Sequence, residues 1–590
     1  MPKTRQAARR FARERAKGGT AVALEAAPAA VATAATPPKP SPWILDRWRD
    51  LLLFVGTPAL LIPIFSAAQS RWSAQDIFLF VGAFGAMGHH LPGMIRAYGD
   101  PGLFRRFKTR FVIAPIALLA VCIWSTFYNV QAVQLVAFAW GIWHGMMQTY
   151  GFSRIYDAKG SAAAAAARAR ADFALCLSWF IAAVLLSPLR FRSALDLYYE
   201  SGGPVIPPVA VVAARNSLVV MLAAVTVFFL WRHWRDWRAG RAISPVKMTL
   251  LLSSIGFWWY CNNGVQNILV GIALFEVFHD VQYLAIVWIY NRTRVERDES
   301  IGGFMRFVFR RSGSLIGVYV GLVVAYGALG LVAQGVSSEW IKQSLIGVVT
   351  ASALLHFYYD GFIWKVRETQ TRSALGINDP GMVASSLRRP IPVWLGHSLR
   401  WAALGVPFAA LCAAQLAGRT VPAVERTEKV AEVLPHDAKA QLNHGKALHE
   451  AGRTQEAIAR YEAAVTLQPS LAEAQMFLGL AWSDLGELNR SVEHYNRALE
   501  LEPKDARAEC NLAGVLARSG RRVEARQRFE HSLELDPKLF LAHKGLADLL
   551  RGAGDYDGAI THYSEALRLN PDLVEARDGL EAVRIVSGKR

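Results

Sequence analysis

The sequence predicts an all-α protein, a polytopic transmembrane bundle of about 10 or 11 helices followed by a helical solenoid. Three observations predict this class. Hydrophobic residues make up 53% of the 590 residues, and the mean hydropathy of +0.21 is too high for an ordinary soluble chain. Apolar runs long enough to cross a bilayer recur between residues 43 and 420. A regular repeat fills the remainder of the chain.

The first 42 residues form a basic tail and a linker. Lysine and arginine dominate residues 1–19, and alanine and proline dominate residues 20–42. No apolar core follows the basic stretch at once, which argues against a cleaved export signal. We expect a disordered cytoplasmic tail that lies on anionic lipid.

The predicted membrane domain, residues 43–420, contains about eleven apolar spans. They cover approximately residues 51–68, 76–95, 111–129, 131–151, 172–189, 210–231, 247–261, 265–290, 313–334, 341–364 and 399–417. The connections after the even-numbered spans are basic, whereas those after the odd-numbered spans carry few charges. The positive-inside rule then predicts an integral protein of the bacterial cytoplasmic membrane, with its N-terminus cytoplasmic and its C-terminal domain periplasmic.

The C-terminal domain, residues 421–590, repeats every 34 residues. Prolines keep this spacing from Pro435 to Pro571, and mid-turn glycines keep it as well. One aromatic residue per unit has the same register: Tyr461, Tyr495, Phe529 and Tyr563. The pattern resembles the tetratricopeptide repeat (TPR) family from about Pro435 to Val586, with four repeats and a partial one as a cap. The resemblance implies a concave groove that binds a protein or peptide partner, without catalysis.

Histidines recur at one depth in the even-numbered spans. Span two carries His89 and His90, span four His144, span eight His279 and span ten His356. In each span the first histidine lies about thirteen residues after the start, and these spans all run in the same direction. They therefore share a depth near the middle of the membrane. If the four helices are neighbours, we expect their imidazoles to converge.

Acidic residues accompany these histidines on the same helix faces. Span eight places four polar residues on a face about 100° wide: Glu276, His279, Asp280 and Tyr283. Asp360 follows His356 by one helical turn. A carboxylate at the bilayer centre costs about 2.5 to 3.5 kcal/mol, which a bound ion would offset. Imidazole together with carboxylate suits iron, manganese or zinc.

A metal site is therefore predicted, with these ligands: His89, His90, His144, Glu276, His279, Asp280, His356 and Asp360. Tyr283 and Tyr359 are the candidate catalytic residues, and Gln148 is a candidate supporting residue. The constellation loosely resembles membrane-bound desaturases, hydroxylases and other histidine-rich non-haem iron oxygenases, although their HxxxH and HxxHH boxes are absent. The resemblance implies mono- or dinuclear iron that activates dioxygen on a membrane lipid or isoprenoid. Zinc and haem are the alternative cofactors.

Three other functions stay open. Membrane domains joined to TPR arrays resemble certain protein mannosyltransferases, which suggests a glycosyltransferase using a lipid-linked sugar, but the first outer loop, Gln69–Gln75, is short for one. Two histidines could instead be the axial ligands of a haem in an electron-carrying protein. A transporter or assembly scaffold would use the polar stripe to relay protons.

The remaining features predict no chemistry. The five cysteines are scattered, so neither a disulfide framework nor a thiolate zinc site is encoded. Many of the residues behind the net charge of +18 lie at the ends of apolar runs, so we expect no nucleic-acid partner. His233 and His397 lie in basic interfacial segments, where solvation is expected.

Overall fold

Helices are the regular elements of the part of the chain that the structure describes, which confirms the all-α prediction for these residues. The computed structural model describes residues 41–160, 162–297, 301, 303–309, 313–328, 332, 335–363, 393–418 and 420–588. The predicted tail (residues 1–40), the basic connection from Lys365 to Arg389 and the side chain of His397 lie outside this description.

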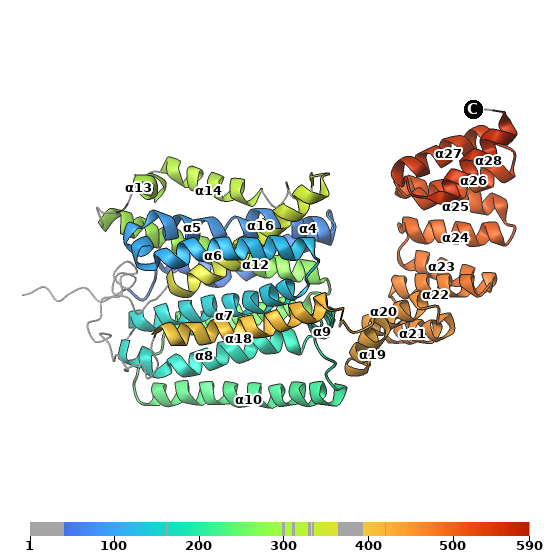
Figure 1. The fold of residues 1–590 in the computed structure, drawn as a ribbon. Helices are drawn as coiled ribbons and strands as arrows, with labels where there is room; N and C mark the ends of the chain where they lie inside the picture. Colours follow the sequence, from blue (N-terminus) through green and yellow to red (C-terminus); the bar gives the residue numbers. More distant parts are fainter. Residues whose placement is uncertain are drawn as a thin grey trace, which may run out of the picture. The chain divides into compact units, whose positions relative to one another are not determined.

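The N-terminal region is a bundle of long helices, several of which run roughly parallel (Figure 1). Its elements are α2 (Arg47–Asp50), η1 (Leu51–Gly56), α3 (Thr57–Gln69), α4 (Ala74–Val81), η2 (Gly82–Met87), α5 (His90–Gly99), α6 (Pro101–Phe127), α7 (Ala132–Gly160), α8 (Ala162–Leu185), α9 (Pro188–Glu200), α10 (Pro208–Arg238), α11 (Pro245–Trp259), η3 (Tyr260–Gly264), α12 (Ile268–Arg297), α13 (Gly303–Phe309), α14 (Gly313–Gly327), α16 (Glu339–Ile363) and α18 (Val393–Leu416). The η elements are π-helical turns, a local widening of the helix that often occurs at functional sites. Each predicted apolar span falls on one or more of these helices.

Five helices of the described chain are long and apolar enough to cross a membrane, or six if one bent pair forms a single span. They are Arg47–Gln69, Ala74–Gly99, Pro101–Phe127, Pro208–Arg238 and Ile268–Arg297, and the pair is α8 with α9, bent by 82°. The sequence predicts about eleven spans, which is more than this count. The predicted spans outside this count include those on α11 and α14, which have 15 residues each, and the one on α18, where the apolar helix is the shorter Trp401–Leu416. The helices α7 and α16 are long enough but are not among the candidate spans.

A buried ionic cluster joins α7, α8, α10 and α11. The Nζ atom of Lys247 lies 2.7 Å from Asp157 Oδ2 and 2.8 Å from Asp172 Oδ2. The Nη1 atom of Arg154 lies 2.9 Å from both carboxylates. His233 is buried in this cluster, with its Nε2 3.4 Å from Lys247 Nζ. The predicted solvation of His233 is therefore wrong, because α10 continues through it to Arg238 and turns it into the bundle.

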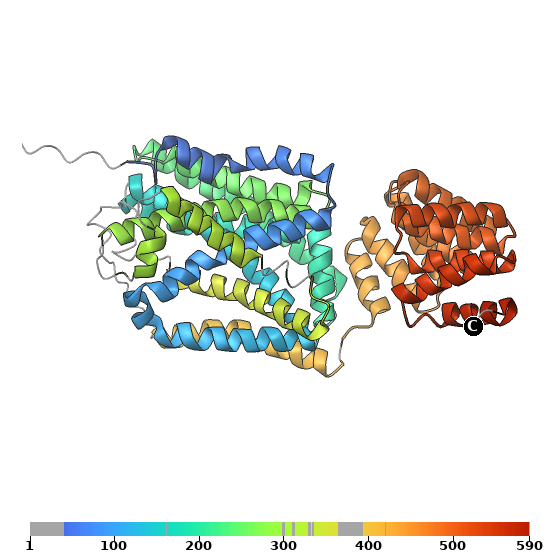
Figure 2. The same cartoon turned by 90° about the horizontal axis from the view of Figure 1, so that it is seen from above.

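The C-terminal region is a stack of helical pairs, which Figures 1 and 2 show from two directions. Its elements are α19 (Ala423–Val433), α20 (Ala438–Glu450), α21 (Thr454–Leu467), α22 (Ala472–Asp484), α23 (Leu488–Leu501), α24 (Ala506–Arg518), α25 (Arg522–Leu535), α26 (Phe540–Gly552), α27 (Tyr556–Leu569) and α28 (Val574–Ser587). Four pairs run from α20 with α21 to α26 with α27, and α28 packs against the last pair with Leu580 and Val583 buried. This is the predicted arrangement of four repeats and a cap.

Glycine permits two features of each pair. Gly486, in the turn between α22 and α23, has a φ of +81°, which lies in the left-handed region that favours glycine. Within α22, a Cβ atom on Gly479 would lie only 2.9 Å from the ring of Tyr495. The absence of a side chain at Gly479 therefore lets this ring pack between the two helices, where it is 1% exposed.

Candidate metal centre

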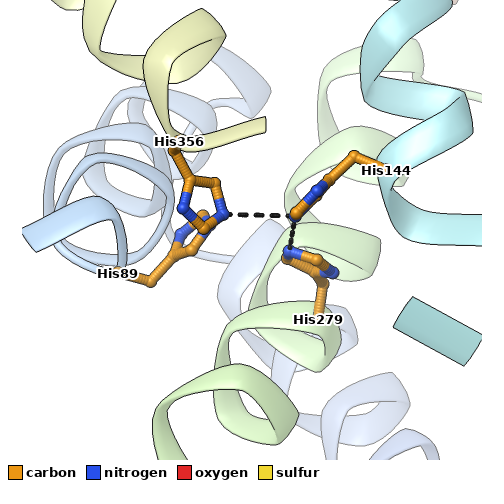
Figure 3. Close-up of side chains that lie close together, drawn as sticks. All are labelled: His89, His144, His279 and His356. Carbon is orange, nitrogen blue, oxygen red and sulfur yellow. Dashed lines mark hydrogen bonds between the residues drawn. The ribbon is translucent and has the colours of Figure 1, made fainter. Parts of the chain in front are cut away.

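Four histidine imidazoles converge inside the N-terminal bundle (Figure 3). His89 lies between η2 and α5, His144 lies on α7, His279 on α12 and His356 on α16. Their exposed fractions range from 1% to 8%. One ring nitrogen of each histidine lies within 4.8 Å of the corresponding nitrogens of the other three. The structure thus brings together one histidine from each of the four spans in which the sequence places them at a common depth.

The Nε2 atoms of these histidines form a chain of short contacts. His89 Nε2 lies 3.1 Å from His356 Nε2, which lies 3.2 Å from His144 Nε2, which in turn lies 3.1 Å from His279 Nε2. The Nε2 atom of a neutral imidazole carries either one proton or one lone pair, so it serves two further nitrogens poorly. Four lone pairs directed at one cation would satisfy all of these atoms at once.

The spacing of the nitrogens fits a single metal ion. Metal–imidazole bonds of about 2.0 to 2.1 Å place neighbouring nitrogens about 3.3 Å apart around a tetrahedral ion and about 2.9 Å apart around a square one. The observed contacts of 3.1 and 3.2 Å fall between these values. These three contacts are thus compatible with one shared ion, and the remaining nitrogen pairs lie within 4.8 Å.

Asp360 lies beside the imidazoles. Its Oδ2 atom is 3.7 Å from His356 Nε2 and 3.9 Å from His144 Nε2. Its Oδ1 atom accepts a hydrogen bond of 2.9 Å from the Tyr283 hydroxyl. The ring of Tyr283 also lies edge-on to the ring of His356, with centroids 4.8 Å apart. Asp360 therefore lies beside two of the four imidazoles, and the Tyr283 hydroxyl holds its carboxylate in place.

Asp280 contacts the far edge of one histidine. Its Oδ1 atom lies 2.7 Å from His89 Nδ1, and both side chains are buried. A carboxylate at Nδ1 favours the tautomer that leaves the Nε2 lone pair available to a metal. Gly85 in η2 makes this approach possible, because a Cβ atom there would lie 2.5 Å from Asp280 Oδ2. The sequence predicts Asp280 as a ligand, whereas the structure places it as the partner of a ligand.

His90 does not belong to the four-histidine cluster, although its neighbour His89 does. Its Nδ1 atom bonds to Ser352 Oγ at 2.9 Å, and its ring stacks on the outer side of His356 with centroids 4.8 Å apart. Adjacent residues of a helix point about 100° apart, so only one of the pair His89 and His90 can face the common centre. Ser352 is absent from the sequence prediction, although its position one turn before His356 could have indicated it.

Glu276 and Tyr359 also do not belong to the group of converging side chains. Glu276 is partly exposed and does not belong to the metal-competent group found among the described residues. The Tyr359 hydroxyl bonds to the Tyr98 hydroxyl at 2.8 Å, and its ring packs edge-on against Phe111. The predicted catalytic position of Tyr359 is therefore not supported, because α16 turns this side chain toward α5 and α6.

A pair of glutamines supports the backbone of α12 at His279. Gln148 Nε2 donates to the His279 carbonyl at 3.0 Å and to Gln282 Oε1 at 3.1 Å. Gln282 Nε2 donates in turn to the Phe54 carbonyl in η1 at 2.7 Å. Gln148 is predicted from the sequence as a supporting residue, whereas Gln282 is not, although a glutamine beside Tyr283 in an apolar helix could have indicated it.

Comparison with protein families identifies the C-terminal region. Models of the tetratricopeptide repeat match residues 421–472, 442–506 and 504–572. Together with the helical pairs, these matches show that this region consists of TPR repeats. The matches lie outside the bundle that holds the histidines.

Several solved TPR structures are similar to the same region. MamA from Desulfovibrio magneticus RS-1 is 18% identical, with a TM-score of 0.24, over 30% of this chain and 93% of that chain. YrrB, described as a TPR protein with an unusual peptide-binding site, is 20% identical, with a TM-score of 0.25, over 28% and 87% of the two chains. A thermophilic TPR protein from Thermus thermophilus is 20% identical, with a TM-score of 0.26, over 32% and 98%. A search of curated proteins gave no significant match.

Proposed function

We propose that the N-terminal bundle is a membrane-embedded, metal-dependent oxidoreductase that acts on a lipid or isoprenoid, and that the TPR region docks a protein or peptide partner. The observation that carries the proposal is the convergence of four buried imidazole nitrogens, with Asp360 beside them. The candidate spans support a location in the bilayer. The proposed topology keeps the N-terminus cytoplasmic and the repeats periplasmic in a bacterial cytoplasmic membrane.

A single iron ion is the cofactor we favour. Four imidazoles and Asp360 would occupy five positions of an octahedral centre and leave one open for a reactant. Zinc prefers four ligands, so four imidazoles would leave it no open position. Dinuclear carboxylate centres take glutamates from several helices. The converging group found among the described residues consists of imidazoles without a glutamate, which favours one ion over two.

The charges around the site also favour a bound cation. Asp280 and Asp360 are buried beside the imidazoles, with side chains 5% and 11% exposed. Two carboxylates in such surroundings are costly unless they are paired. A divalent ion held by neutral imidazoles would balance both of them.

Each residue of the site has a distinct task in this proposal. A bound iron would supply one-electron chemistry and the activation of dioxygen. The four histidines hold the ion, and Asp280 fixes the orientation of His89. Tyr283 holds a proton 2.9 Å from Asp360, close to where a reactant would bind. The ring of Phe357, with its centroid 4.6 Å from that of His144, helps to exclude water.

Haem and glycosyl transfer fit this geometry less well. A porphyrin between two axial histidines needs an empty plane, but here the two other imidazoles would occupy that plane. For glycosyl transfer, Asp76 in the first turn of α4 already accepts a hydrogen bond of 2.7 Å from Ser73, the N-cap residue of that helix. A proton-relaying scaffold would use the same histidines without a metal, so metal content separates it from the oxidoreductase.

Metal analysis of the purified full-length protein tests the proposal. After expression with iron, manganese and zinc supplied, we expect close to one equivalent of iron by mass spectrometry of the elements. The double variant His279→Ala/His356→Ala should lose this metal, whereas His90→Ala should keep it because His90 is an equally buried imidazole outside the cluster. A wild-type protein far below one equivalent of any transition metal contradicts the proposal, and a Soret band would favour haem.

The docking role has a separate test. The 34-residue register predicts Asn443, Phe477, Asn511 and Gly545 as groove positions. Phe477 is partly exposed and carries the Lys446 ammonium 4.7 Å above its ring. A photo-crosslinking residue at Asn511, a neighbouring groove position, should capture a protein partner in cells. The same residue at Glu534 on α25, outside the predicted groove positions, is the control. Equal capture at both positions contradicts specific docking in the groove.

A further inference from the structure

A line of mainly polar residues follows the seam between α5 and α12 away from the metal centre. Its facing pairs are His89 with Asp280, Gly93 with Tyr283, Arg96 with Tyr290, and Asp100 with Arg294. The positions on each helix recur every three, four or seven residues, so they share one face. Nothing in the proposed metal chemistry requires the pairs beyond Tyr283.

The contacts along this seam are close. A Cβ atom on Gly93 would lie 2.8 Å from the Tyr283 hydroxyl. Arg96 Nη2 donates to the Tyr290 hydroxyl at 2.9 Å, and Arg294 Nη2 lies 2.9 Å from Asp100 Oδ2. At a rise of about 1.5 Å per residue, the line from Tyr283 to Arg294 is about 16 Å long. It reaches the last turns of α12, where α12 leaves its apolar run.

Asn291 indicates that this seam contains water. Its side chain is 0% exposed, and within the described chain neither the amide nitrogen nor the amide oxygen has a hydrogen-bond partner. A buried polar group without a partner costs about 1 to 3 kcal/mol. Ordered water normally satisfies such groups. Asn291 precedes Arg294 by three residues on the same helix, so water bonded to it would lie beside the polar line.

We propose that the α5–α12 seam is a hydrated proton route that connects the Asp100–Arg294 end of α12 with the Tyr283–Asp360 pair. This inference rests on the proposed metal centre, because that centre is where the protons would be consumed. A proton passes from water at Asn291 to the Tyr290 phenol and on toward Tyr283, whose hydroxyl already donates to Asp360.

Each phenol oxygen on this route accepts one proton as it releases its own. No residue is oxidised, and no charge accumulates on either ring. Arg96 is a positioning residue, because its hydrogen bond to Tyr290 holds the phenol in the seam. The alternative is that these contacts only hold α5 against α12. In that case no water lies between the two helices.

Hydroxyl-radical footprinting of the full-length protein measures the water directly. X-ray pulses generate radicals from bound water, so a buried ring next to water is oxidised and a dry ring is spared. Tyr290 is 2% exposed, and Tyr156, outside the seam, is 1% exposed and donates to Asp50, which makes it a matched control. We expect Tyr290 to be oxidised about tenfold faster than Tyr156. We expect Asn291→Leu to remove the difference, and equal rates in the wild type would overturn the route.

Proton uptake by the iron-loaded protein tests whether the route delivers protons to the metal centre. Wild type, Asn291→Leu and Tyr290→Phe are first shown to carry equal iron, since none of these changes removes a proposed ligand. Each is then reduced in a stopped-flow mixer with a pH-sensitive dye. We expect both variants to take up protons about tenfold more slowly. Unchanged rates would overturn the inference. A wild type without iron would instead contradict the proposed function, and the footprinting result is independent of metal.

Discussion

At the scale of single residues, the candidate centre depends on which edge of each imidazole faces the common point. His89 shows this most clearly, because its Nε2 atom faces His356 at 3.1 Å while its Nδ1 atom faces Asp280 at 2.7 Å. In the proposed metal site the same ring would bind the ion through one edge, and it faces the Asp280 carboxylate with the other. His90, one residue later, has neither role because the helix turns it away.

The contact between Asp280 and His89 predicts that the negative charge of Asp280 strengthens metal binding. Asp280→Asn keeps the size of the side chain but removes the negative charge beside His89 Nδ1. We expect iron affinity to fall about 10- to 100-fold, measured by competition with a chelator. Asp236→Asn removes a carboxylate that is also buried, 2% exposed, but lies on α10, and should leave the affinity unchanged. Equal affinities for all three proteins would show that Asp280 does not act through His89.

At the scale of elements, the π-helical turn η2 sets the rotation of the chain that enters α5. It ends two residues before His89 and includes Gly85, where a Cβ atom would lie 2.5 Å from Asp280 Oδ2. A regular helix through the same residues would change the direction of every later side chain, because the wider turn adds a residue. The position of η2 therefore helps to decide that His89 is the member of its pair that joins the cluster.

Two glycines of η2 give a matched test of this element. In Gly85→Ala the new Cβ atom would lie 2.5 Å from Asp280 Oδ2, so the carboxylate must move from His89. In Gly82→Ala the new atom meets nothing within 4 Å. We expect Gly85→Ala to weaken iron binding about tenfold or more and Gly82→Ala to leave it unchanged, by the same chelator competition. Equal effects of the two variants would mean that η2 does not position the carboxylate.

The glycines in the turns between repeat helices predict how alanine substitutions change the stability of the repeats. Gly486 has a φ of +81°, so Gly486→Ala should destabilise the α22–α23 pair by about 1 to 2 kcal/mol. Gly514→Ala, inside α24 with open space around it, should stabilise its helix by about 0.5 to 1 kcal/mol. Native-state hydrogen exchange of the full-length protein measures both local changes. The same sign for both variants would contradict the backbone argument.

At the scale of the whole molecule, a buried ionic cluster that includes none of the four converging histidines also holds the N-terminal bundle together. The Lys247 ammonium is 0% exposed and joins residues of α7, α8 and α10 to α11. Such a cluster orients long helices whose apolar faces would otherwise slide past one another. It therefore contributes to the alignment of α7, which carries His144.

Removal of the central cation tests this role. Lys247→Met keeps much of the side-chain volume but leaves Asp157 and Asp172 with Arg154 as their nearest remaining cation. We expect a loss of about 3 kcal/mol in the free energy of unfolding, measured by denaturant titration in detergent. Lys342→Met, which removes an exposed lysine 3.8 Å from Glu339, should have little effect. Similar losses in the two variants would contradict the importance of the buried cluster.

The sequence by itself determined the helices, the TPR repeats and the common depth of the histidines. These properties depend on local periodicity, and each can be counted along the chain without knowledge of its neighbours. Repeat spacing likewise predicts the buried ring of Tyr495 and the turn at Gly486, because both recur in every unit.

Only the tertiary structure decided which polar side chains meet. It placed His356 and His144 nitrogens 3.2 Å apart, set Asp280 against His89, and turned Tyr359 toward Tyr98. The physical reason is that the rotation of each helix about its own axis depends on packing against other helices and on irregular turns such as η2. A rotation of a helix by about 100° about its own axis replaces the residue that faces the site by the next one in the sequence. The positions of the spans in the sequence do not specify this rotation.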